Sequence, residues 1–128
     1  MQATPIRDSF AACPKELLAV GYGPESQVLV SKGKIYQVTA LARWREAFYL
    51  QVVNDVNSPT WLPSWLFEVT DKSLPSDWIC TLQDDDLQMI LGPAFIARDE
   101  ASYTRMVELE PDSVAAFWSR YSDHSSTT

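Results

Sequence analysis

The stretch TWLPSWLFEV, residues 60–69, decides how the rest of the chain is interpreted. TWLP has the composition of a short strand, and Pro63 must end it because proline has no backbone N–H to donate to a β-ladder. Ser64 to Phe67 then have the composition of one tight helical turn, and FEVT resumes as a strand. A strand, a helical turn and another strand in direct succession predict the closing corner of a small β-structure.

Short β-segments flank this corner on both sides. KIYQVTALA and AFYLQVV, separated by the charged RWRE of residues 43–46, predict a hairpin. NDVNSP, residues 54–59, has turn composition, and WICTL, residues 78–82, predicts a further strand. A short strand is also expected around Phe10 to Cys13, and an extended piece at residues 28–30. Short strands separated by turn signals in this way predict a small barrel.

The pattern becomes helical after QDDD. Gly92-Pro93 can open a short helix, since proline is tolerated at the first helical position. Asp99 can cap a following helix whose apolar face is Tyr103, Met106 and Val107. Pro111 opens a last helix with an apolar stripe at helical spacing, formed by Val114, Phe117, Trp118 and Tyr121.

This order of elements predicts one α+β domain over residues 1–128. The expected parts are a barrel at about 1–82, helices packed against it at about 90–122, and a flexible tail at 123–128. The helices are expected to cover one face or an open edge of the barrel, which would also protect an exposed strand edge.

LPSWLFEV resembles the terminal strand, turn and strand of Src-homology-three-type barrels. More widely, GKIYQV, FYLQVV, WLPSWLFEVTDKSLPSDW and LGPAF resemble a group of small bacterial proteins over residues 30–121. In that group such a barrel is combined with C-terminal helices, and some members belong to toxin–immunity loci. The resemblance implies a Src-homology-three-like barrel with C-terminal helices and no catalytic activity.

The chain departs from the Src-homology-three domains that bind polyproline. It has no ALYDY-like stretch, the aromatic position of the terminal motif is Leu66, and the polar position is Trp65. Pro63 and Ser64 match the motif, but they also serve the corner. These departures put a polyproline groove in doubt.

Charge is unevenly distributed along the chain, whose net charge is −7. Residues 1–67 hold six Lys and Arg against five Asp and Glu, whereas residues 68–128 hold four against twelve. An acidic surface repels phosphate, which argues against nucleic acid and anionic membranes as partners. It attracts a basic protein, although acidity also serves solubility alone.

Location and redox chemistry follow from a few residues. No apolar run approaches the roughly 20 residues that span a bilayer. The opening MQATPIRDSF contains Asp8 and no apolar secretion-signal core, so a cytoplasmic location is expected. Cys13 and Cys80 are therefore expected to be reduced thiols. The chain's one histidine, His124, lies in a polar tail, which disfavours a Cys/His catalytic pair.

Candidate partner-binding residues come from three places. Trp44 lies between two arginines at the expected hairpin tip, and Trp and Arg are enriched at binding hot spots. An arginine that simply stacks on Trp44 is the alternative. The acidic run after residue 83 lacks the spacing of a calcium loop and reads more simply as a hydrated turn. The candidates are Arg43, Trp44, Arg45, Trp65, Asp84, Asp85 and Asp86.

The sequence thus predicts a non-enzymatic binding protein, in its sharpest form an immunity-type inhibitor of a basic toxin. No catalytic, metal or cofactor motif is recognised: GYG at residues 21–23 lacks the glycines and helix of a dinucleotide loop. The alternatives are an adaptor module that self-associates or joins a larger assembly, and a small-ligand-binding protein.

Overall fold

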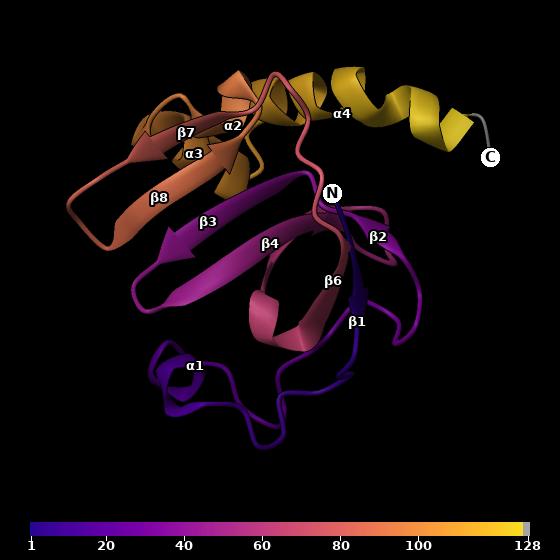
Figure 1. Cartoon of the computed structure of the whole chain (residues 1–128), viewed down its shortest axis with the longest axis vertical. Helices are drawn as coiled ribbons and strands as arrows, with labels where there is room; N and C mark the ends of the chain where they lie inside the picture. The colour runs from indigo at the N-terminus through magenta and orange to yellow at the C-terminus, as the bar shows by residue number, and fades with distance from the viewer. Residues whose placement is uncertain (127–128) are drawn as a thin grey trace.

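The protein is an α+β structure of two antiparallel sheets and a helical layer (Figure 1). The computed structural model describes the backbone of residues 1–126 and the side chains of residues 1–121. The strands are β1 (Gln2–Pro5), β2 (Tyr36–Gln37), β3 (Ala40–Trp44), β4 (Ala47–Val53), β5 (Pro59–Pro63), β6 (Phe67–Asp71), β7 (Ile79–Leu82) and β8 (Leu87–Gly92). The helical elements are α1 (Lys15–Ala19), the 3-10 turn η1 (Ser64–Leu66), α2 (Ala94–Ala97), α3 (Glu100–Val107) and α4 (Pro111–Ser126).

The strands form two separate sheets and not the closed barrel that the sequence predicts. One sheet has the order β2-β1-β6, and the other has the order β5-β4-β3-β8-β7. Strand β8 pairs with the edge of β3, and β7 extends the sheet beyond it. Because β7 and β5 remain as edges, the larger sheet stays open instead of closing on itself.

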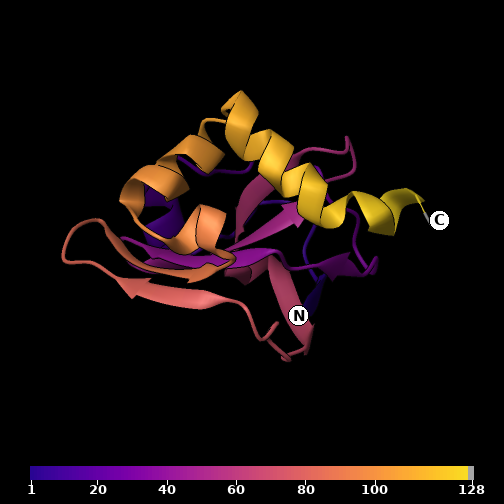
Figure 2. The same cartoon turned by 90° about the horizontal axis from the view of Figure 1, so that it is seen from above.

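The larger sheet separates two hydrophobic cores. Helices α2, α3 and α4 cover one of its faces (Figure 2), and the core there contains Ala40, Ala42, Ile90, Ile96, Met106 and Phe117. The opposite face packs against the smaller sheet and the segment before β2, with Ala3, Phe10, Val38, Leu50, Val52, Leu62 and Leu66 in that core. Gly92 allows a close approach at the end of β8, since a Cβ there would lie 3.0 Å from the Ala40 Cβ.

The predicted helix signals are confirmed. Asp99 is the N-cap of α3, and its Oδ1 accepts a hydrogen bond from the Ser102 N–H at 2.8 Å. Helix α4 begins at Pro111, and its apolar stripe packs into the core, with Phe117 and Tyr121 buried. The corner is also confirmed, because β5 ends at Pro63 and η1 leads directly into β6.

Four segments differ from the prediction. Residues 10–13 form a turn and not a strand, because Phe10 is buried by loop packing without sheet alternation. Residues 28–30 form no strand, although the Leu29 carbonyl accepts a hydrogen bond from the Asp55 N–H at 2.8 Å. Helix α1 lies within the predicted barrel part, and β8 extends over residues 90–92 of the predicted helical part.

The predicted tail overlaps the end of α4. Helix α4 runs through Ser126, residues 127–128 lie outside the described residues, and the side chains of residues 122–128, including His124, lie outside them as well. No helix in the described part of the chain is long and apolar enough to cross a membrane.

Candidate functional site: an aromatic pocket beside two facing turns

The turns β3–β4 and β7–β8 lie side by side at one end of the larger sheet (Figure 1). The Arg45 N–H donates a hydrogen bond to the Asp86 carbonyl at 2.6 Å, and Arg45 Nε lies 3.6 Å from Asp86 Oδ2. Arg45 has a φ of 55°, a backbone conformation that is uncommon for a residue other than glycine. The sequence-predicted arginines and aspartates are therefore brought together by the pairing of β3 with β8.

Neighbouring residues at the end of β3 face opposite sides of the sheet, as strand alternation requires. The Arg43 guanidinium lies 4.9 Å from the centroid of the Phe48 ring, and its Nε donates to Gln88 Oε1 at 3.0 Å. Trp44 faces the helical side, and the Arg45 guanidinium lies 4.5 Å from its ring centroid. The stacked arginine that the sequence left as an alternative is present, and Trp44 also lines a pocket.

That pocket, which we call the aromatic pocket, has a volume of about 340 Å³. This volume falls within the range of small-molecule sites. Its lining is aromatic and aliphatic and comes from the α1–β2 segment, β3, β4, β5 and α3: Val20, Tyr22, Trp44, Tyr49, Trp61, Tyr103 and Val107.

Tyr22 is positioned by the end of α1. The Gly21 N–H donates to the Leu18 carbonyl and the Tyr22 N–H donates to the Leu17 carbonyl, each at 3.1 Å. This is the hydrogen-bond pattern of a Schellman cap, and Gly21 supplies its left-handed residue with a φ of 107°. The Tyr22 ring then stacks on the buried Phe10 with centroids 4.4 Å apart.

The sheet and α3 supply the other rings. Gln51 pairs with Trp61 and Tyr49 pairs with Pro63, so Tyr49 and Trp61 lie on the same face of neighbouring strands. The Trp44 and Tyr49 rings meet edge to face at 6.1 Å, and the Trp61 and Tyr103 rings are tilted at 5.2 Å. These are favourable geometries for aromatic pairs, and they hold the rings in place around the pocket.

The tyrosine hydroxyls of the pocket have no hydrogen-bond partner among the described side chains. Within residues 1–121, no hydrogen bond is made by the hydroxyl of Tyr22, Tyr49 or Tyr103, and none of these oxygens is fully shielded from solvent. Burial, assisted by the proximity of Tyr49, raises the pKa of Tyr22 and of Tyr103 to about 12. Burial also raises the pKa of Tyr49, while nearby Arg45 opposes the change. All three hydroxyls are therefore neutral at physiological pH and remain available to a ligand.

An acidic hollow of about 430 Å³ adjoins the aromatic pocket and shares Val20 with it. Four carboxylates and one guanidinium line this hollow: Glu16, Glu46, Asp85, Asp86 and Arg45. Asp85 also accepts from the Leu87 N–H at 3.1 Å, and its hydrogen bond with Glu100 raises the pKa of Glu100. Asp84 is exposed in the same turn, and no cluster of metal-binding side chains occurs among the described residues.

Trp65 lies apart from this group, in η1. The Arg7 guanidinium stacks 4.4 Å from its ring centroid, and Arg7 Nη1 donates to the Trp65 carbonyl. Trp65 lines a separate hollow of about 450 Å³ with Pro63, Phe48 and Leu17. The structure thus groups six of the seven predicted residues at one end of the sheet and leaves Trp65 outside that group.

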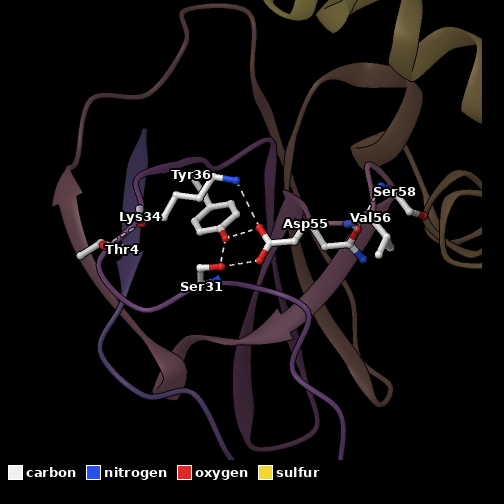
Figure 3. Close-up of polar contacts among 8 residues, drawn as sticks. Thr4, Ser31, Lys34, Tyr36, Asp55, Val56 and Ser58 are labelled. Carbon is white, nitrogen blue, oxygen red and sulfur yellow. Dashed lines mark hydrogen bonds and ion pairs between the residues drawn. The ribbon is translucent and has the colours of Figure 1, made fainter.

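A second polar cluster, centred on Asp55, links the β2 approach to the β4–β5 turn (Figure 3). Asp55 accepts from Ser31 Oγ and from the Tyr36 hydroxyl, each at 2.6 Å, and from Lys34 Nζ at 3.2 Å. The Ser31 N–H donates in turn to the Tyr36 hydroxyl at 2.7 Å. Hydrogen bonds from Ser31 and Tyr36 lower the pKa of Asp55. Because its charged and hydroxyl groups are partnered with one another, we interpret this cluster as one that stabilises the fold.

No family model matches the chain, no curated protein matches its sequence and no solved structure matches its fold. Sequence reasoning missed Tyr22, Tyr49, Trp61 and Tyr103 as site residues. Strand alternation was a usable signal for Tyr49 and Trp61, whereas the position of Tyr22 depends on a cap that the sequence analysis did not identify.

Proposed function

We propose that the chain is a non-enzymatic binding protein that recognises a cationic partner at the end of the larger sheet. The observation that carries the proposal is the contact between the aromatic pocket and the acidic hollow. Aromatic anchors are the residue types that dominate binding energy, and surrounding carboxylates accelerate the approach of a positively charged partner. A basic protein that inserts one side chain into the pocket fits both features.

Binding is favoured over catalysis by the chemistry of the pocket lining. A general acid or base works best with a pKa near the operating pH. The titratable groups in the aromatic pocket are tyrosines whose pKa values lie above the usual value, with Tyr22 and Tyr103 at about 12. Such groups keep their protons at neutral pH and act as neutral contacts.

In its narrower form, the proposal makes the chain an immunity-type inhibitor of a basic toxin within a Src-homology-three-like fold. The fold likeness is supported by β1, which pairs with both β2 and β6, and by η1 between β5 and β6. The β7–β8 hairpin and the helical layer would then be additions to that arrangement. The inhibitor role depends on the sequence resemblance and on the acidic hollow.

Affinity capture from a lysate of the source organism, repeated at low and high salt, tests this proposal. We expect a basic protein that is held at low salt and released at high salt, because exposed charge pairs are screened by salt. The double variant D85N/D86N should weaken the capture. Its matched control is E68Q/D71N on β6, which makes the same change in net charge away from the hollow.

Two results would contradict the proposal. If the two double variants weaken the captured complex equally, the attraction depends on net charge and not on this site. If capture is indifferent to salt and to both variants, the acidic hollow has no part in recognition.

Self-association is a second candidate function, favoured by the free edge of the larger sheet. Strand β7 pairs only with β8, and its residues Ile79 and Leu82 are 39% and 75% exposed. An exposed apolar edge strand is a template for pairing with another chain. Sedimentation velocity over a range of concentrations should then show a dimer that L82K disrupts; a monomer at every concentration would remove this candidate.

A further inference from the structure

We propose that the aromatic pocket binds a quaternary ammonium group. This inference rests on the proposed function, because it names the chemistry of the cation that the same end of the molecule would recognise. Five aromatic rings surround a volume of about 340 Å³, which accommodates a trimethylammonium group together with part of the chain that carries it. Cages of aromatic rings attract such groups through the negative faces of the rings.

The pocket already shows how its rings interact with a cation. The Arg45 guanidinium lies 4.5 Å from the centroid of the Trp44 ring, within the distance of a cation–π contact. Tyr49, Trp61 and Tyr103 extend the aromatic lining beyond Trp44. Since the raised pKa values of Tyr22 and Tyr103, at about 12, keep their hydroxyls neutral, these rings provide polarisable surface and oxygen acceptors without a fixed charge.

The charges around the pocket favour a cation over an anion or a neutral ligand. The adjoining hollow places Glu16, Glu46, Asp85 and Asp86 against Arg45. Asp86 lies 3.6 Å from Arg45 and compensates its charge, which leaves the remaining carboxylates in excess. The local field therefore has the same sign as the net charge of −7.

Hydration selects a quaternary ammonium over a primary one. A primary ammonium is a compact and strongly hydrated charge, and it loses much of that hydration on entering an aromatic pocket. A trimethylammonium group has no N–H to satisfy, and its methyl groups contact apolar rings directly. Val20 and Val107 complete a lining that suits methyl groups.

The trimethylammonium group can be supplied by a free small molecule of the choline type or by a trimethylated lysine side chain of a protein. Isothermal titration calorimetry at constant ionic strength separates these sources with four probes. They are tetramethylammonium chloride, choline, a short trimethyllysine peptide and its unmodified lysine counterpart. The neutral carbon isostere of choline, in which a tert-butyl group replaces the trimethylammonium group, tests the charge.

We expect the cations to bind and the neutral isostere of choline to bind at least about tenfold more weakly than choline. The unmodified lysine peptide should bind more weakly than the trimethylated one. Tighter binding of choline than of the trimethyllysine peptide assigns the site to a small molecule, and the reverse order assigns it to a modified side chain. Equal binding of choline and its isostere, or no binding of any cation, overturns the proposal.

Variants show whether the pocket is the site. Y103L should reduce choline affinity about tenfold, whereas Y103F, which keeps the ring, should change it by less than about threefold. W44L should also lose binding, while W118L makes the same substitution at a half-buried tryptophan in a different hollow and should retain it. Thermal melts of each variant identify any that fail to fold. Loss of choline binding in W118L and not in W44L would place the site elsewhere and overturn the proposal.

This test is separable from that of the proposed function. Failure of every cation to bind overturns the quaternary ammonium inference, even where D85N/D86N still weakens capture of a basic protein. In that case the acidic hollow recognises the partner without a trimethylammonium group. Binding of choline with no salt-sensitive capture supports the inference and contradicts the protein partner.

Discussion

The aromatic pocket and the Asp55 cluster both contain tyrosines, but the tyrosine hydroxyls of the two regions differ in their hydrogen bonding. In the Asp55 cluster, the Tyr36 hydroxyl donates to Asp55 at 2.6 Å and accepts from the Ser31 N–H at 2.7 Å. In the aromatic pocket, the hydroxyls of Tyr22, Tyr49 and Tyr103 have no partner within the described side chains. These hydroxyls keep contact with solvent and can hydrogen-bond to water or to a ligand, so the difference separates a region that stabilises the fold from one suited to a ligand.

Removal of the Tyr36 hydroxyl tests most directly whether the Asp55 cluster stabilises the fold. Y36F should lower the free energy of unfolding by about 1–2 kcal/mol, because it leaves the Ser31 N–H and the Asp55 carboxylate each without one partner. Chemical denaturation measures the change. A variant as stable as the unchanged protein would show that the Asp55 cluster does not stabilise the fold.

The next largest effect is expected at the turn that positions Tyr22. G21A should cost about 1 kcal/mol, because alanine is strained at a φ of 107°. A new Cβ at Gly21 would have no atom within 4 Å, so the loss is conformational and not steric. Denaturation of G21A against A19G, a change at the end of the same helix, checks whether the loss comes from the positive φ. Full stability of G21A would contradict the cap as described.

Asp55 and the pocket tyrosines should respond to opposite ends of the pH scale. Hydrogen bonds lower the pKa of Asp55 below its usual 3.8, so its contribution to stability is complete above that value and is lost as pH falls through the lower folded pKa. Tyr22 and Tyr103 have pKa values raised from 10.0 to about 12, so their contribution is complete below 10 and declines as pH rises towards 12.

The free energy of unfolding, measured across pH in matched variants, tests these two pH dependences separately. D55N should reduce the slope of the acid limb, whereas Y22F should reduce the slope of the alkaline limb and leave the acid limb unchanged. Absorbance of tyrosinate during an alkaline titration checks the same pKa values directly. Ordinary titration of all the tyrosines near pH 10 would contradict the raised pKa values of Tyr22 and Tyr103.

The smallest effect on stability is expected for Y49F. The Tyr49 hydroxyl makes no hydrogen bond within residues 1–121, so its removal should change the free energy of unfolding by less than about 0.5 kcal/mol. Y36F and Y49F therefore form a matched pair of identical substitutions at two buried tyrosines. If Y49F lowers the free energy of unfolding as much as Y36F does, the proposed difference between the two regions is wrong.

The elements that sequence reasoning predicted carry their signals locally. Pro63 ends β5 by lacking a donor, Asp99 caps α3, and the stripe of α4 lies on one helical face. Helix α1 was missed because a five-residue helix depends on tertiary contacts more than on propensity. Strand β8 was missed because LQMILG leads directly into Gly92-Pro93, which was interpreted as the start of a helix.

The candidate site was only partly predictable for a related reason. Residue types alone predict Arg43, Trp44 and Arg45 as candidates at a hairpin tip, but β3 extends through Trp44, so Arg45 is the one that lies in the turn. Pairing of β3 with β8 then brings the acidic turn beside them. The pocket itself combines side chains from separate elements, including Tyr22, Trp61 and Tyr103. No short stretch of sequence contains that combination, because it exists only once the larger sheet, α3 and the α1 turn are assembled.

The central position of β1 in its sheet has a consequence for the order of folding. Its two neighbours are β2 and β6, and Gln2 pairs with both Gln37 and Asp71. During synthesis, β1 must therefore wait until residues 67–71 have left the ribosome before the small sheet can close. Such distant pairing slows folding and leaves strand edges unpaired in the meantime. A nascent chain that stops short of β6 should remain a client of chaperones, whereas one that includes it can bury Ala3 and complete the core beneath the larger sheet.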